Sequence, residues 1–279
     1  MEEDFYKKAV IKFPEDYVDE ETKYTRVVVD SRVRDKTLFP NPNYYDVPFE
    51  DDINDVKTAK LIYIDIPMSL YLINANFNTI YFNINSNSYM ATIPNGNYTA
   101  TELATIITSQ MNATVSAASV ATTFTVSYIP RLDNFTFESD RLAFSLLFAG
   151  KPRNLAILLG FSDMKTQYTS DTNREISSEF RKNFNYNNYI IMDIEQFDML
   201  KSIDRDLNKS FAMIPNSSTN LNIIDELNII KHFSPSIPRL NKLRVRLYDR
   251  FGNPYDCQNM DHRFEIVFTS FKQKRKYMH

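Results

Sequence analysis

The sequence predicts an all-β fold, mainly strands with one or two short helices, and three observations support this prediction. The chain is rich in strand-forming aromatic residues, with 17 Tyr and 21 Phe, beside many Ile. Apolar and polar residues alternate with a period of two in many short segments. Segments with helical periodicity are few, which favours a β-sandwich or barrel over a fold of alternating strands and helices.

The predicted strands are short segments that combine alternation or β-branching with flanking turn residues. The proline-marked loop or edge strand that contains Pro40 and Pro42 follows the first of them, and Pro67 ends the second. Residues 222–233 are a less clear segment. The predicted strands cover residues 25–30, 56–66, 79–84, 88–93, 122–129, 134–139, 142–148, 189–197, 210–215, 242–249 and 262–271.

One helix is predicted from residue 99 onward. Thr99 and Glu102 have the spacing of a capping box, in which each side chain satisfies an amide of the first helical turn. An apolar stripe follows and predicts a helix packed on a sheet. The stripe consists of Leu103, Ile106, Ile107 and Met111. A second, shorter helix is expected over residues 151–159, ended by Gly160.

The chain shows no low-complexity linker and no internal repeat. We therefore expect one β-sandwich domain over residues 23–271, with an inserted polar loop around residues 162–186. An acidic N-terminal arm, residues 1–22, precedes it, and a basic C-terminal tail, residues 272–279, follows it.

Composition restricts the compartment and the partners. With 32 Lys and Arg against 35 Asp and Glu, the net charge of −3 gives no global attraction to nucleic acid or to an anionic membrane. The single cysteine, Cys257, cannot form an internal disulfide, which is typical of a reducing compartment. No apolar run reaches the length of a bilayer span, and the N-terminus is acidic and polar, so we expect a soluble protein made in the cytosol.

The common catalytic and cofactor-binding motifs are absent. Only four glycines occur, and they are far apart, so no P-loop, dinucleotide fingerprint or G-x-S-x-G elbow can be written. The three histidines have no metal-ligand spacing, and we expect no metal and no cofactor. A Cys257/His262 dyad is weighed against an ordinary turn thiol and a strand-end imidazole, and the ordinary reading is favoured.

Clustered carboxylates are the remaining candidates for acid–base chemistry. On a strand Asp193 and Glu195 would share one face, but a solvated face or loop is the simpler interpretation for such pairs. We therefore predict no catalytic residue and no enzymatic activity. If the chain were an enzyme, Asp193, Glu195 and His262 would be the first candidates. The carboxylate clusters are Glu50-Asp51-Asp52, Asp193/Glu195 and Asp204/Asp206.

Two surface features suggest contacts with other molecules. Basic residues at the C-terminus make a patch for an acidic neighbour, nucleic acid or an inner membrane, with a solvated tail as the alternative. Asn-x-Ser/Thr sequons also occur, at a frequency expected by chance in an Asn-rich chain. The basic residues are Lys272, Lys274, Arg275 and Lys276, and the sequons lie at Asn97, Asn112, Asn134 and Asn216.

An ordered set of motifs runs along the chain: a Ser-Arg-x-Arg-Asp segment leads into Pro-Asn-Pro, a strand ending in Ile-Pro, an Asn-rich hairpin, and Gly-x-Tyr-Thr before a helix. This ordered set resembles structural proteins of nucleocytoplasmic large DNA viruses and related virophage-like viruses. The likeness spans residues 24–271, while residues 1–22 lie outside it. The matching residues are Ser31, Arg32, Arg34, Asp35, Pro40, Pro42, Ile66, Pro67, Gly96, Tyr98 and Thr99.

This resemblance implies a jelly-roll-like β-sandwich and a place in the virion as a minor capsid or penton (vertex) component. The implied partners are the major capsid protein, minor capsid proteins and further copies of the chain. A carbohydrate- or receptor-binding β module on a fibre or spike is the alternative. Because aromatic residues are enriched in interface cores, the predicted interface residues are Tyr44, Tyr45 and Phe49, with Lys274, Arg275 and Lys276 in the tail. A packed-core role is the alternative for the three aromatic rings.

Overall fold

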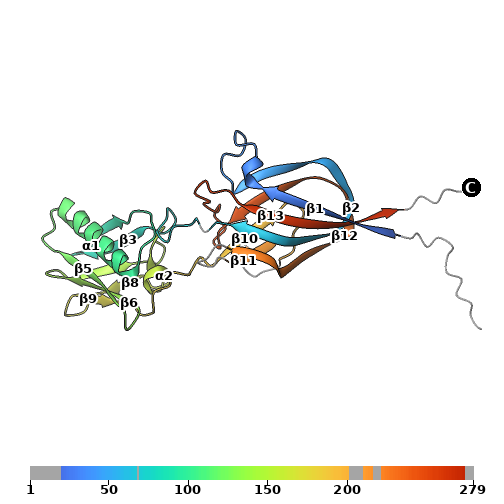
Figure 1. Ribbon diagram of the computed structural model, residues 1–279. Coiled ribbons are helices and arrows are strands. Elements are labelled where there is room, and N and C mark those ends of the chain that lie inside the picture. The colour runs from blue at the N-terminus through green and yellow to red at the C-terminus, as the bar shows by residue number, and fades with distance from the viewer. Residues whose placement is uncertain (1–19, 68, 201–209, 216–220, 274–279) are drawn as a thin grey trace, which may run out of the picture. The chain divides into compact units, whose positions relative to one another are not determined.

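The computed structural model describes residues 20–67, 69–200, 210–215 and 221–273. These residues form antiparallel sheets with two α-helices, which confirms the predicted all-β, jelly-roll-like class (Figure 1). They divide into two compact units: the described residues within 1–68 and 190–279 form unit 1, and those within 69–189 form unit 2. The predicted single domain with a loop around residues 162–186 differs from this division, because the inserted segment is much longer and folds as a unit of its own.

Unit 1 contains a six-stranded sheet in the order β1-β13-β2-β12-β10-β11. Strands that are far apart in the sequence pair in this sheet. For example, β1 pairs with β13 from Glu20↔Gln273 to Asp30↔Arg263. The first and last described segments of the chain therefore lie side by side. The strands are β1 (Glu20–Asp30), β2 (Tyr44–Ile66), β10 (Tyr189–Ile194), β11 (Ala212–Pro215), β12 (Leu221–Tyr248) and β13 (Arg263–Gln273).

The two longest strands, β2 and β12, lie side by side in the middle of the sheet of unit 1. They pair with each other along most of their length, with three register shifts. The second half of β2, from Val56, also pairs with β13, whereas Phe49 in its first half contacts the ring of Phe268 of β13 at a centroid distance of 6.3 Å. The first half thus faces β13 across the core. Asp55, which has a φ of 53°, directly precedes the part of β2 that pairs with β13.

Unit 2 contains a four-stranded sheet, β4-β3-β7-β8, and a three-stranded sheet, β5-β6-β9. The predicted hairpin of β3 and β4 is confirmed, and Asn85 and Ser86 take positive φ values in its turn without a glycine. The strands are β3 (Thr79–Ile84), β4 (Asn87–Thr92), β5 (Phe124–Ile129), β6 (Asn134–Ser139), β7 (Phe144–Leu147), β8 (Gln167–Thr169) and β9 (Glu175–Ser177).

The two helices of unit 2 lie where the caps predict them. Helix α1 (Ala100–Ala117) begins after Thr99, and both hydrogen bonds of the capping box with Glu102 are present. Helix α2 (Ala156–Leu159) is shorter than predicted and ends at Gly160, which has a φ of +82°. An alanine there would bring its Cβ within 2.2 Å of the carbonyl oxygen of Phe180, so the close approach of these backbones requires glycine.

Two parts of the prediction change in the structure. The polar segment 162–186 contains β8 and β9, which pair with β7 and β6, so it is not a loop throughout. Residues 222–233 are strand, as the first part of β12. Both segments pair with distant strands, and the backbone bonds of such pairing override weak local alternation. Within the part of the chain that the structure describes, no helix combines the length and the apolar character needed to cross a bilayer.

Candidate interaction surface

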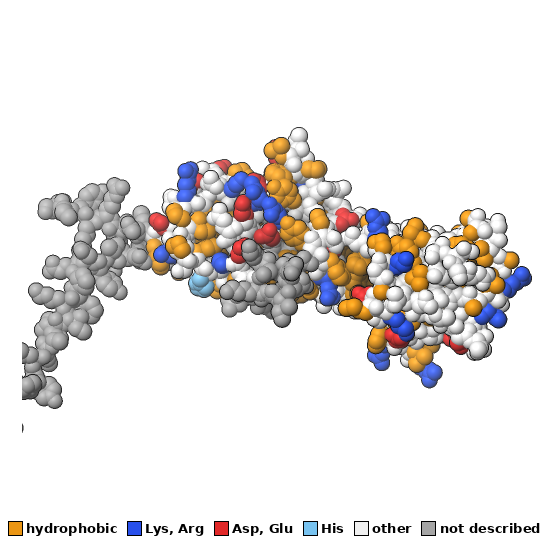
Figure 2. All heavy atoms as spheres, turned by 180° about the vertical axis from the view of Figure 1, so that it is seen from behind, with side chains coloured by type: hydrophobic (Ala, Val, Ile, Leu, Met, Phe, Trp, Pro, Cys, Tyr) orange, Lys and Arg blue, Asp and Glu red, His pale blue; other side chains and the backbone are white. Residues whose placement is uncertain are grey.

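A loop between β1 and β2, residues 31–43, projects from unit 1 and is called the projecting loop (Figure 1). It begins with a 3-10 helix, Ser31–Val33, capped by the carboxylate of Asp30. The loop exposes apolar side chains to solvent: Val33 is 83% exposed and Leu38 is 71% exposed. Figure 2 shows hydrophobic side chains gathered on this projection. Exposed apolar residues that cluster on a projection mark a surface for contact with another molecule.

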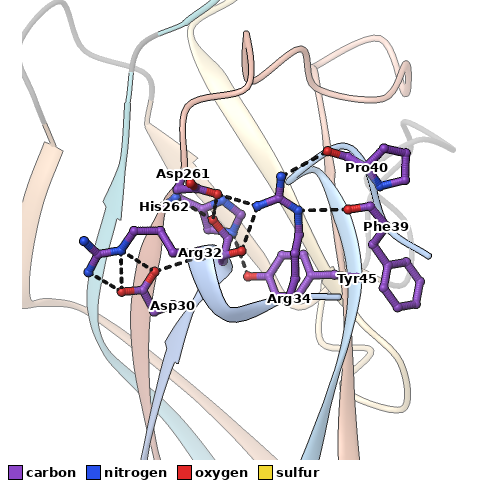
Figure 3. Close-up of polar contacts among 9 residues, drawn as sticks. Asp30, Arg32, Arg34, Phe39, Pro40, Tyr45, Asp261 and His262 are labelled. Carbon is purple, nitrogen blue, oxygen red and sulfur yellow. Dashed lines mark hydrogen bonds and ion pairs between the residues drawn. The ribbon is translucent and has the colours of Figure 1, made fainter. Parts of the chain in front are cut away.

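Arg34 holds the projecting loop to the body of unit 1. Its buried guanidinium donates to the carbonyl oxygens of Ser31 (2.7 Å), Phe39 (3.0 Å) and Pro40 (3.0 Å), and it forms an ion pair with Asp261 (Figure 3). Four contacts from one side chain fix both ends of the turn. Because a buried guanidinium is tolerated only when its donors are satisfied, this arrangement holds the loop in one conformation.

Ser31 connects the start of the loop to the start of β13. Its amide donates to the carbonyl oxygen of His262 (2.9 Å), its hydroxyl donates to Asp261 (2.9 Å), and its Oγ accepts from the amide of His262 (2.9 Å). The Asp261 pKa is held below its usual value, because hydrogen bonds from Ser31 and Arg34 outweigh the opposing effect of burial. The ionised carboxylate is therefore part of the anchor.

His262 and Tyr45 form a buried pair beneath the loop. The Tyr45 hydroxyl lies 2.8 Å from Nε2 of His262, while Nδ1 of His262 has no hydrogen-bond partner among the described residues. Burial lowers the pKa of His262 to about 4, so the imidazole is neutral at pH 7. Burial also raises the pKa of Tyr45. Which group donates depends on the imidazole tautomer: with the proton on Nδ1 the Tyr45 hydroxyl donates to Nε2, and with the proton on Nε2 the ring donates to the Tyr45 oxygen.

A cavity of about 560 Å³ lies between the projecting loop and the first half of β2. Its apolar lining comes from Val33, Leu38, Phe39, Val47 and Pro48. The charged residues beside it already have partners within the chain. Asp46, for example, accepts from Lys242 (2.9 Å) and Arg244 (2.9 Å), which hold its pKa below the usual range. The cavity therefore offers apolar surface rather than unpaired charge to a ligand.

The structure separates the predicted interface residues. Tyr44 is 40% exposed and packs edge-on against Phe39 of the projecting loop, at a centroid distance of 5.3 Å. Phe49 is half-buried against Phe268. Tyr45 is only 1% exposed, so its ring lies in the core and presents no surface to a neighbour. This corrects its assignment as an interface residue, and the reason is the inward alternation of β2. Lys274, Arg275 and Lys276 lie outside the described residues.

The groups weighed for catalysis do not form one site. Asp193 of β10 and Glu195, which directly follows this strand, lie beside arginines of β12, with Arg246 3.8 Å from Asp193 and Arg244 3.1 Å from Glu195. His262 instead packs beneath the projecting loop. Burial raises the pKa of Cys257 to about 12, so its thiol is protonated and no hydrogen bond joins it to His262 in the described structure.

Other sequence candidates have simple roles or lie outside the described residues. Asn112 uses its side-chain amide to donate to the carbonyl oxygen of Phe124 (2.9 Å), so this sequon nitrogen is engaged in the fold. Asp52 pairs with Arg239 (2.5 Å). Among the described residues, no group of three or more His, Cys, Asp or Glu side chains is placed to hold a metal ion. Asp204, Asp206, Asn216 and residues 1–19 lie outside the described part.

Sequence reasoning missed Val33 and Leu38 as surface residues and Arg34 as their anchor. The signal was present, since Ser31 and Arg34 belong to the motif behind the viral resemblance. Val33 lies between two arginines and Leu38 stands alone before Phe-Pro. Neither residue belongs to an alternating or helical pattern that would have predicted its exposure. Only the partner of Arg34, 227 residues away, shows why that motif is needed.

The chain is similar to one protein family and to solved structures. The model of a family of unknown function, DUF5901, matches residues 16–188, which is more than half of the chain. No curated protein matches the sequence. The crystal structure of the selenomethionine-labelled mavirus penton protein is 11% identical, with a TM-score of 0.48. The alignment covers 90% of this chain and 99% of that one.

Proposed function

The chain belongs to the DUF5901 family, whose function is unknown, and we propose that it is a non-enzymatic structural protein of a virus particle. In this proposal it acts as a minor capsid or penton component, and the projecting loop is the surface that contacts a neighbouring shell protein. It works by adhesion. Its place is in the virion, after synthesis in the host cytoplasm.

The observation that carries the proposal is the way the projecting loop is held. Arg34, Ser31 and Asp261 form a polar network that holds the loop with Val33 and Leu38 in solvent. Apolar side chains on a rigid support bind with little loss of conformational entropy, which is the property of a preorganised docking surface. An enzyme would need convergent ionisable groups in a cavity, and the cavity beside this loop is lined by apolar groups and paired charges.

The resemblance to virion proteins adds support from the sequence. The motif residues Ser31 and Arg34 build the anchor, and Thr99 builds the cap of α1. The motif residues therefore build the frame of both units, while the exposed apolar residues of the loop remain for contacts.

The proposal is tested with purified virus particles. The chain should sediment with the particles and be found by mass spectrometry in their capsid fraction. A Val33→Asp/Leu38→Asp double variant should fold but fall at least about tenfold in particle-bound amount, because buried apolar anchors carry most of the energy of an interface. Leu132→Asp is the matched control: it changes an exposed leucine of unit 2 and should remain particle-bound.

Two outcomes would overturn the proposal. Absence of the wild-type chain from every particle fraction removes the structural role. Full retention of the double variant would remove the projecting loop as the contact surface. A glycan array with the same proteins checks the alternative of a carbohydrate-binding module, for which the wild type would bind and the loop variant would not.

A further inference from the structure

His262 joins the start of the projecting loop to the body of unit 1 through its backbone. Its amide donates to the hydroxyl oxygen of Ser31 (2.9 Å), and its carbonyl oxygen accepts from the Ser31 amide (2.9 Å). The preceding residue, Asp261, accepts from the Ser31 hydroxyl and forms the ion pair with Arg34. These contacts between the loop and the body therefore meet at two neighbouring residues, Asp261 and His262.

The imidazole of His262 lies against these contacts and is closed off from water. The residue is only 3% exposed, and the ring of Phe264 lies nearly parallel to it at a centroid distance of 6.3 Å. In Figure 3 the side chains of Asp261, Arg34 and Tyr45 are grouped around the ring. Nε2 has Tyr45 as its partner, but Nδ1 has no acceptor among the described residues. The site therefore lacks an acceptor for the N–H at Nδ1 that an imidazolium must carry.

A proton on His262 would place a second cation in this cluster. Burial is the largest cause that lowers the pKa of the imidazole to about 4, and the guanidinium of Arg34 acts in the same direction. Asp261 opposes them, but its carboxylate is already engaged by Ser31 and Arg34. An imidazole in water has a pKa of about 6.5. Acid therefore favours any conformation in which the ring reaches water.

No other group around the His262–Tyr45 pair changes its charge substantially as the pH falls from 7 to 4.5. Hydrogen bonds outweigh burial at the two aspartates and hold their pKa values below the usual 3.8. Burial raises the pKa values of the tyrosine and the thiol, which stay protonated, and the guanidinium stays charged. His262 is thus the group that responds to mild acid. The surrounding groups are Asp30 at the end of β1, Arg34 in the loop, Tyr45 of β2, and Cys257 and Asp261 before β13.

We infer that mild acid releases the projecting loop from unit 1, with His262 as the group that takes up the proton. Release separates Ser31 and Arg34 from Asp261 and His262 and brings the imidazole to water, while the strands of unit 1 stay paired. This goes beyond the proposed function, because the release is a property of the chain alone. In a virus particle it would free the surface made by Val33 and Leu38 from its neighbour.

The size of the response follows from proton binding to one imidazole. Its pKa is 6.5 in the released state and about 4 in the held state, so the released state binds the proton first as the pH falls. The ratio of released to held molecules should therefore rise about twentyfold between pH 7 and pH 5. The response levels off below pH 4, where both states carry the proton.

Hydrogen exchange of the full chain, read by NMR, tests this release. The Ser31 amide reports on the loop because its acceptor is the His262 carbonyl oxygen, and the β12 amides that bond to β2 report on unfolding of unit 1. After correction for the intrinsic exchange rate, the opening constant at Ser31 should rise about twentyfold from pH 7 to pH 5. At pH 5 it should also exceed the opening constants of the β12 amides.

Two variants identify the group that takes up the proton. His262→Gln keeps the backbone contacts with Ser31 but does not titrate, so its opening constant at Ser31 should not change between pH 7 and pH 5. His232→Gln, at an exposed position of β12, is the matched control and should respond like the wild type. If His262→Gln does not fold, the wild-type slope decides: the logarithm of the opening constant should change by about one per pH unit between pH 6 and pH 4.5, which is one proton.

Four results would each overturn the inference: an opening constant at Ser31 that does not rise in acid, a slope that differs from one proton, a full response in His262→Gln, or equal opening constants at Ser31 and in β12 at pH 5. The last result would mean that the loop leaves only when unit 1 unfolds. Because exchange is measured without particles, failure here leaves the proposed virion role in place. Absence of the chain from particles would in turn leave the acid release in place.

Discussion

Arg34 forms an ion pair with Asp261 across 227 residues of sequence, and this contact joins the projecting loop to the start of β13. The guanidinium side chain is buried, and its other donors reach three backbone carbonyls of the loop. A single side chain therefore couples the motif that begins with Ser31 to the closing strand of unit 1. Its removal affects the charge balance and the backbone bonding of the loop together.

Arg34→Met should destabilise unit 1 by about 3 kcal/mol, because it leaves Asp261 without its cation and several loop carbonyls without a donor. Methionine keeps much of the aliphatic packing. Urea unfolding followed by circular dichroism measures the change. Arg32→Met is the matched control: its side chain is exposed beside Asp30, so a much smaller loss than for Arg34→Met is expected. Equal losses in the two variants would contradict the role of Arg34.

Folding stability should fall between pH 6.5 and about 4 because of His262. Its pKa is 6.5 when unfolded and about 4 in the folded protein, mainly through burial, so the unfolded state binds the proton first as pH falls. The loss amounts to about 3 kcal/mol and is complete near pH 4. Tyr45, Asp261 and Arg34 surround this imidazole. The aspartates with lowered pKa values, such as Asp46, contribute in a separate window below their unfolded value of 3.8, and the two glutamates with lowered pKa values, Glu102 and Glu179, contribute below 4.5.

Urea titrations at several pH values measure this dependence, and ¹³C NMR of the wild-type imidazole gives its pKa directly. His262→Gln should flatten the slope between pH 6.5 and 4, whereas His232→Gln, at an exposed position of β12, should keep it. An imidazole of His262 that titrates near 6.5 in the folded protein would show that the ring is not buried as described.

The sequence predicted those strands and helix ends that depend on interactions between residues close together in the chain. Period-two alternation located β3, β5 and β6, and Thr99 with Glu102 located the start of α1. These features depend on neighbouring residues alone. The division into two units was missed because the chain enters unit 2 after Pro67 and leaves it at Tyr189 without any glycine- or serine-rich linker.

The anchor of the projecting loop could not be predicted for a different reason. The alternation of β2 gives the faces of Tyr44 and Tyr45 only relative to each other, so both tyrosines were candidates for a surface until the fold placed Tyr45 inward. The pairing of β1 with β13 brings Asp261 and His262 to the loop. Such a contact depends on topology, and no local pattern contains it.

Gly160→Ala should destabilise unit 2 by about 2–4 kcal/mol. The glycine has a φ of +82°, and an added Cβ would lie 2.2 Å from the Phe180 carbonyl oxygen, so both strain and overlap oppose the change. Gly150→Ala separates the two effects, because Gly150 has a φ of +69° with nothing near the added Cβ and should cost only about 1 kcal/mol. Hydrogen exchange of unit 2 amides, measured by mass spectrometry, compares the variants. Similar protection in both would mean that the Phe180 backbone moves away at little cost.

Asn112 fastens α1 to the edge of β5 through both ends of its amide: Nδ2 donates to the carbonyl oxygen of Phe124 (2.9 Å), and Oδ1 accepts from its amide (2.7 Å). Asn112→Ala should cost about 2 kcal/mol, since two backbone groups lose their partner. Asn112→Asp keeps the acceptor but places a carboxylate against the Phe124 carbonyl, so its loss should approach that of alanine at pH 7 and shrink when the carboxyl is protonated and can donate. Thermal unfolding at pH 7 and pH 4 measures both variants against the wild type at each pH. An Asn112→Asp loss that stays constant with pH would show that the donor half of this contact contributes nothing.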